Sequence, residues 1–230
     1  MNEDKKVVAI VGNCISYKDN DAFANLLTRG SGNILATAKS VKKADAKLKY
    51  AVSVFNIGRY ILCGKMNVIK ECVQIESLSD ITLDIDRYFT GCYILKNFAK
   101  INDKSTDPAL FDKTIDVLTK LTYGEIEPIV AQMDFLSGML QLNGFNTEFK
   151  TCSVCGKPFE CAAFDVEAGV VCRPCSTPSQ SIYISREAIQ CIQGKETSEK
   201  YMLETVLLLE EIIYHYMGIK IIKNKETELK

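Results

Sequence analysis

Two pairs of cysteines are the residues in this chain best suited to chemistry. Cys152 and Cys155 form one Cys-x-x-Cys pair, and Cys172 and Cys175 form a second pair sixteen residues further on. Four thiolates in two close pairs suit a tetrahedral Zn²⁺ ion, because each short turn places two sulfurs on one metal. Gly156 follows the first pair, where a tight turn is easiest to make. The spacing therefore predicts one zinc ion held by these four cysteines.

The predicted zinc ion is expected to be structural. Four cysteine ligands complete its coordination shell, whereas a catalytic zinc keeps one position open for water or substrate. Three acids lie between the pairs, at Glu160, Asp165 and Glu167, and they would repel phosphate. The remaining six cysteines are scattered among apolar neighbours, and we interpret them as small buried side chains in a reducing compartment.

A second group of residues suited to binding is a run of lysines near the N-terminus. Residues 38–50 contain one acid and five lysines, namely Lys39, Lys42, Lys43, Lys47 and Lys49. The chain as a whole has a net charge of −1, yet residues 1–65 carry 11 Lys/Arg against 5 Asp/Glu. Such a basic segment predicts a surface that binds phosphates with little regard to sequence. The alternative interpretation is a solvated loop with no ligand.

Aromatic side chains near the lysine run are candidates for stacking on bases. They are Tyr17, Phe23, Tyr50, Phe55 and Tyr60. Aromatic rings also fill hydrophobic cores, and the sequence leaves both interpretations open for each ring.

The residues before and after the lysine run have the sequence pattern of short β-strands. Apolar and β-branched segments at 6–11, 23–27, 34–38, 52–57, 59–63 and 67–75 are separated by glycines and polar turns. This pattern predicts a small barrel or sandwich. The lysine run would be a loop between two of its strands. Barrels of the oligonucleotide-binding (OB) type bind single strands with such loops beside a strand face.

Beyond residue 78 the apolar periodicity becomes helical. Tyr88, Cys92, Leu95 and Ala99 are spaced as one face of a helix, and Asp107-Pro108 and Glu127-Pro128 have the form of helix starts. A last helix is expected from about Ser198 to Met217. We therefore predict an α+β chain with a β domain at 1–78. An α-helical domain would follow at 79–230, carrying a four-cysteine zinc-finger insertion at 151–178 between helices that pack together.

The sequence contains no recognisable catalytic site. It lacks phosphate-binding and nucleophile motifs, and His215 is its single histidine. No apolar run reaches the length that a membrane span needs, and the first residues do not resemble an export signal. These features favour a cytoplasmic binding protein that is not an enzyme.

Several motifs resemble the bacterial DNA repair and recombination mediator family RecO. The segment from Phe23 to Arg29, a turn glycine at Gly32 and the run from Ala36 to Lys43 are similar to that family's strand, turn and basic loop. The stretch from Phe135 to Phe145 leads into Cys152-Ser153-Val154-Cys155-Gly156, as in the family. The run Phe164-Asp165-Val166-Glu167-Ala168-Gly169-Val170-Val171-Cys172 is the most specific match. Ser40 stands where the family commonly has glycine.

The resemblance implies an OB-fold barrel at 1–78, followed by the helical domain with its zinc-binding insertion, and it also implies a function. Family members bind single- and double-stranded DNA, anneal complementary strands, and join RecR to load RecA onto DNA coated by single-strand-binding protein, whose C-terminal tail they bind. The resemblance also places the chain in the RecFOR pathway. It implies a location in the bacterial cytoplasm, at the nucleoid, and no membrane partner. The predicted DNA-binding residues are the five lysines and Arg29. Three alternatives stay open, namely an RNA-binding OB-fold protein with a structural zinc, a zinc enzyme and a scaffold that binds only proteins.

Overall fold

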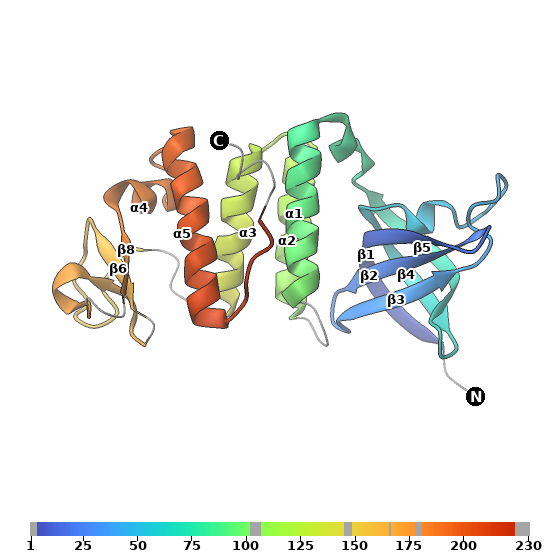
Figure 1. Ribbon diagram of the computed structural model, residues 1–230, viewed down its shortest axis with the longest axis horizontal. Helices are drawn as coiled ribbons and strands as arrows, with labels where there is room; N and C mark the ends of the chain where they lie inside the picture. Colours follow the sequence, from blue (N-terminus) through green and yellow to red (C-terminus); the bar gives the residue numbers. More distant parts are fainter. Residues whose placement is uncertain (1–3, 102–106, 145–148, 166, 178–180, 224–230) are drawn as a thin grey trace. The chain divides into compact units, whose positions relative to one another are not determined.

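A five-stranded barrel comes first in the chain, and helices and a small sheet that carries the cysteines follow it (Figure 1). The computed structural model describes residues 4–101, 107–144, 149–165, 167–177 and 181–223. Its strands are β1 (Lys5–Tyr17), β2 (Asp21–Thr28), β3 (Asn33–Ala38), β4 (Asn56–Cys63), β5 (Val68–Ser77), β6 (Ala162–Asp165), β7 (Gly169–Cys172) and β8 (Ser181–Ile184). Its α-helices are α1 (Ile85–Ile101), α2 (Pro108–Thr122), α3 (Pro128–Leu142), α4 (Arg186–Ile192) and α5 (Glu199–Met217). Short 3₁₀ turns are η1 (Tyr50–Val52), η2 (Ser79–Leu83) and η3 (Arg173–Cys175).

The barrel closes on itself, so every one of its strands has two neighbours. The strand order is β1-β2-β3-β5-β4, and β4 pairs back onto β1 in antiparallel fashion. A single parallel contact, Thr37 with Val68, joins β3 to β5. Alternate residues of each strand point inward, and small side chains such as Ala9, Ala24 and Ala36 fill the narrow interior. The α+β class and the OB-like barrel predicted from the sequence are confirmed.

One predicted strand is wrong. Residues 52–57 do not form an extended segment, because η1 occupies Tyr50–Val52 and β4 begins only at Asn56. Phe55 has φ 69°, so the chain bends at this point and buries the Phe55 ring completely. Gly58 lies within β4 rather than between strands, and a Cβ there would lie only 2.9 Å from the Cys72 sulfur. The pattern of apolar residues alone could not separate this buried bend from a strand.

Helices α1 and α2 belong to the same compact unit as the barrel, which extends to Glu125. Gly91 on α1 lies against the barrel, and a Cβ at this position would lie 2.5 Å from Ile81 and 3.0 Å from Phe55. Asn33 of the barrel donates a hydrogen bond to the carbonyl of Ala99 on α1. The compact unit thus runs past residue 78, and the domain boundary predicted there from the sequence stays a prediction.

The buried face of α1 differs from the predicted one. Gly91, Ile94, Leu95 and Phe98 point into the unit, whereas Tyr88 is exposed.

Helix α2 begins as expected, with the Asp107 side chain accepting a 2.8 Å hydrogen bond from the amide of Ala109. No helix within the described residues is both long enough and apolar enough to cross a bilayer.

A second unit comprises residues 126–223. Its helix α3 packs against α5, and α4 also packs on α5. The helices on either side of the cysteine-bearing insertion therefore pack together, as predicted. The insertion contributes an antiparallel three-stranded sheet of order β7-β6-β8. Strand β8 is followed directly by α4, because Ser185 caps α4 by accepting a hydrogen bond from the amide of Ala188.

Candidate metal centre and nucleic-acid interface

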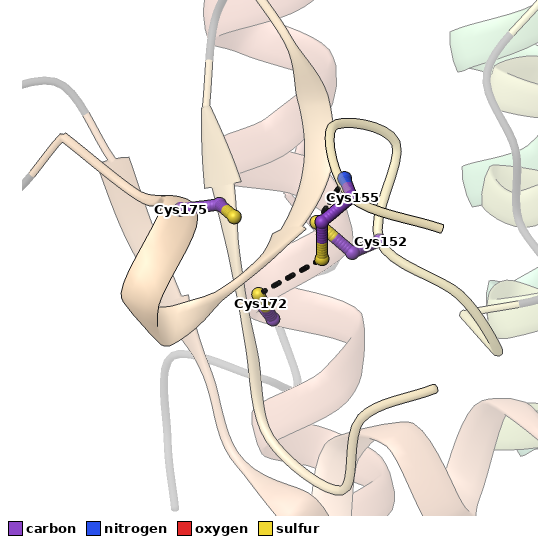
Figure 2. Close-up of side chains that lie close together, drawn as sticks. All are labelled: Cys152, Cys155, Cys172 and Cys175. Atoms are coloured by element: carbon purple, nitrogen blue, oxygen red, sulfur yellow. Dashed lines mark hydrogen bonds between the residues drawn. The ribbon is translucent and has the colours of Figure 1, made fainter. Parts of the chain in front are cut away.

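The four cysteines of the two pairs lie together in the second unit. Their sulfur atoms all lie within 4.8 Å of one another, and Figure 2 shows the side chains converging from two turns. The sulfurs of Cys155 and Cys172, one from each pair, are 3.8 Å apart. Of the four residues, Cys152 is buried and Cys155 is exposed, so the cluster lies at the edge of the sheet rather than inside it.

Backbone hydrogen bonds shape the first turn before any metal is present. The amide of Gly156 donates to the carbonyl of Cys152 over 2.8 Å, and the amide of Cys152 donates to the carbonyl of Lys157 over 2.9 Å. Gly156 has φ 68°, in the left-handed region that glycine adopts without steric cost. A further bond from Ser153 to the carbonyl of Val170 attaches this turn to β7. The second pair spans the end of β7 and η3, so the sheet brings both turns together.

The surroundings of the sulfurs favour a thiolate at one position in particular. Burial opposes ionisation of Cys152, but amide groups led by that of Cys155 donate to its sulfur and lower the Cys152 pKa to about 6. At Cys175, hydrogen bonding to Cys172 raises the pKa to about 12 in the absence of a metal. Because a metal binds cysteine as the thiolate, an ion held by all four sulfurs would release the protons that remain on them.

The geometry fits a tetrahedral metal ion with sulfur ligands. Zinc–sulfur bonds of about 2.3 Å require sulfur–sulfur edges of roughly 3.8 Å, and the Cys155–Cys172 separation has this value. The four sulfurs would complete a coordination shell. The cluster can therefore hold a metal ion, and the all-thiolate set suits structural zinc.

The lysine run lies between β3 and β4, where the sequence placed a barrel loop. Its start is attached to the β1–β2 turn: the amide of Ser40 donates to the Asp21 carboxylate over 2.8 Å, and the amide of Lys42 donates to the carbonyl of Asn20 over 3.1 Å. Ser40 has φ 56°, a backbone conformation that suits glycine. The buried side chain of Val41 anchors the loop in the barrel core. Backbone hydrogen bonds and the buried Val41 side chain thus fix the loop in place, while its lysines point outward.

All five lysines of this loop are exposed. None of them has an ion-pair partner within the described part of the chain, although Asp45 lies in the same loop. Lys39, Lys43 and Lys47 line a hollow of about 310 Å³. Unpaired ammonium groups around a hollow can donate hydrogen bonds to phosphate oxygens without first breaking another contact.

Of the five aromatic candidates, Tyr50 is exposed, and its hydroxyl donates a 2.6 Å hydrogen bond to a backbone carbonyl of β5. The other four divide into two groups. Phe55 and Tyr60 are buried in the unit's interior, so they are excluded as surface platforms. Tyr17 and Phe23 are half-buried on the outer face of β1 and β2, with ring centroids 4.3 Å apart. The ammonium of Lys18 lies 5.2 Å from the centre of the Tyr17 ring. A ring pair beside a cation is the arrangement that single-strand-binding surfaces use for bases and phosphates.

Two exposed aliphatic side chains extend this ring pair, and the sequence analysis missed both. Ile15 is paired with Phe23 across β1 and β2, and Leu35 lies on the neighbouring strand β3 opposite Asn25. Both side chains are exposed. Period-2 alternation could have indicated that these residues point outward with Tyr17 and Phe23, but apolar residues on that face do not by themselves distinguish a binding surface from a covered one.

Arg29 differs from the five lysines because its guanidinium already has a partner. Its Nε and Nη2 atoms donate to the two oxygens of Asp112 on α2, each over 2.7 Å. The Arg29 guanidinium holds the pKa of the Asp112 carboxyl below its ordinary value. No sequence signal pointed to this pair, because 83 residues separate its members. A phosphate at Arg29 would have to share a guanidinium whose charge Asp112 already neutralises.

Comparisons with known proteins agree with the two parts of the chain. Residues 1–78 match a family model described as recombination protein O N terminal, and residues 82–209 match one described as recombination protein O C terminal. Among similar curated proteins is the DNA repair protein RecO of Streptomyces griseus, 28% identical over 186 residues, covering 76% of this chain and 75% of the relative. That of Syntrophomonas wolfei is 24% identical over 189 residues, covering 80% and 75%.

Proposed function

We propose that this chain, which belongs to the recombination protein O family, is a DNA repair and recombination mediator that binds DNA through the loop 39–49 of its barrel. Five exposed lysines without ion-pair partners carry the proposal. They are Lys39, Lys42, Lys43, Lys47 and Lys49. Phosphate contacts of this kind serve single and double strands alike, because they do not read bases.

Bases of a single strand would lie on the outer face of β1–β3. The Tyr17–Phe23 ring pair offers a stacking surface, and Lys18 adds a positive charge beside it. Stacking on aromatic rings contributes about 1–3 kcal/mol per base and tolerates any sequence. We therefore propose that single strands bind more tightly than duplexes at this face. Arg29 is the weakest candidate among the predicted contacts, because Asp112 already occupies its guanidinium.

The wider role follows from family membership. We propose that the chain anneals complementary strands and, with RecR, loads RecA onto DNA coated by single-strand-binding protein, whose C-terminal tail it binds. It makes and breaks no covalent bond in this role. The four cysteines would hold one structural zinc ion that stabilises the second unit, while the barrel residues 1–78 contact DNA.

A salt series on labelled single-stranded DNA tests the binding surface. Glutamate at all five loop positions should abolish binding while the circular dichroism spectrum and melting temperature stay unchanged. Normal binding by that variant would refute the loop as the DNA site. Competition with RNA of the same base sequence tests the nucleic acid preferred, and tighter binding of RNA would point to an RNA-binding protein instead.

A further inference from the structure

Two surface features of the first unit remain outside the proposed DNA site, and their chemistry is complementary. One is a groove on the outer face of β1, β4 and β5. The other is a ridge formed by η2 and the first turn of α1. We propose that the ridge of one copy of this chain docks into the groove of a second copy, which makes the protein a two-fold symmetric dimer.

The groove is lined by aliphatic side chains together with the basic side chains of Lys6 and Arg59. Strand register places Val8, Arg59 and Val73 side by side in one row across the three strands. The adjacent row consists of Lys6, Ile61 and Glu71. These residues line a hollow of about 320 Å³, and Val73 is 53% exposed.

The charge of the groove favours an anionic occupant. Arg59 and Lys6 have no ion-pair partner in the described ranges, while the third basic residue nearby, Lys70, is already paired with Asp4 at 2.8 Å. Glu71 is the single acid of the two rows. An aliphatic floor with two unpaired cations suits an apolar side chain flanked by carboxylates. It offers no exposed aromatic ring on which a base could stack.

The ridge has this complementary composition. Leu83 is 84% exposed and Ile85 is 67% exposed, the two highest values among the large apolar side chains of the described residues. Exposed carboxylates surround them at Asp80, Asp84 and Asp86. This charge repels nucleic acid and excludes DNA as the ligand of the ridge. Exposed apolar side chains rimmed by charged residues are typical of a surface that binds another protein.

Chain connectivity makes a closed pair of contacts possible. Strand β5 supplies Glu71 and Val73 to the groove and leads directly into η2, so both features lie on one continuous stretch of the first unit. In a two-fold dimer, the ridge of each copy meets the groove of the other, and both contacts form at once. No residue lining the groove belongs to the loop 39–49. The dimer would therefore leave two lysine loops available.

Self-association of the full chain tests the proposal without DNA. Light scattering after size exclusion should give about twice 25.7 kDa at micromolar concentration, falling toward the monomer mass as salt increases. Leu83→Asp on the ridge and Arg59→Glu in the groove should each weaken the dimer by about tenfold or more. Both positions are exposed, so the circular dichroism spectrum should not change, and the melting temperature should equal that of the wild type at concentrations too low for dimerisation. Leu35→Asp, on the outer face of β3, and Lys43→Glu, in the lysine loop, are matched controls and should leave the dimer intact.

A charge exchange identifies the docking pair. Arg59→Glu and Asp86→Lys chains should each be monomeric alone, and should form a heterodimer when mixed, because one contact is then native and the other has its charges exchanged. A monomeric wild type, or a dimer unaffected by either change, would overturn the proposal. It would also fail if Arg59→Glu reduced the affinity for labelled DNA but not self-association, since the groove would then serve nucleic acid. Loss of DNA binding in the lysine-loop variants bears on the proposed function alone.

Discussion

The salt dependence of DNA binding should report how many lysines of the loop 39–49 contact phosphates. We choose Lys43 and Lys47 for the perturbation, because both line the same hollow and neither has an ion-pair partner in the described residues. Changing both to glutamine removes two charges while keeping the length and polarity of the side chains close to those of lysine. The backbone hydrogen bonds of the loop should remain.

The magnitude follows from counterion release. Each phosphate neutralised on a single strand contributes about −0.7 to the slope of log K against log salt. Five lysines therefore contribute up to about −3.5, which is roughly a 100-fold loss of affinity between ~50 and ~200 mM salt. The double glutamine variant should lose about 1.4 of that slope. At ~0.1 M salt its affinity should be lower by roughly 25-fold.

Fluorescence anisotropy of a labelled oligonucleotide across a salt series measures both quantities. Lys70→Gln is the matched control, because its charge is already paired with Asp4 on the same barrel, and its slope should equal that of the wild type. Arg29→Gln should behave like this control if Asp112 retains the guanidinium. A wild-type slope in the double variant would refute the reasoning, whatever its affinity.

Three further predictions concern stability. Cys152→Ser, or a strong chelator, should release bound zinc and lower the melting temperature of the second unit, measured by circular dichroism, while single-strand binding persists. Gly91→Val should destabilise the first unit by about 1–3 kcal/mol in urea unfolding, because its side chain would collide with Ile81. The pKa of Asp112 is lowered by Arg29, so the stability from this pair is present at neutral pH and lost as pH falls through that lowered pKa; Asp112→Asn should reduce the acid sensitivity of unfolding.

Specific results would contradict each of these expectations. Unchanged melting after verified metal removal would show that the second unit does not depend on the ion. A wild-type unfolding midpoint for Gly91→Val would mean that α1 can move away from the barrel at little cost. An unchanged acid limb in Asp112→Asn would mean that water screens the exposed pair too strongly for it to matter.

The predictable parts of the fold depend on local signals. The start of α2 at Asp107-Pro108 could be predicted because an N-cap residue and the proline after it act within one turn. The cysteine pairs were readable because a Cys-x-x-Cys turn brings its two sulfurs together whatever surrounds it. The segment 52–57 was not, since the bend at Phe55 is held by packing against α1, a distant element.

By itself, the sequence determined the barrel-then-helix layout, the two cysteine pairs that can hold a metal ion and the concentration of lysines between two strands. Periodicity, turn geometry and charge are properties of neighbouring residues. Only the tertiary structure decided which side chains are exposed and able to bind a ligand. It pairs Arg29 with Asp112 across 83 residues, buries Phe55 and Tyr60, and leaves Leu83 exposed. Such outcomes depend on which distant surfaces meet, and the physical reason is that burial and ion pairing are decided by contacts between elements rather than within them.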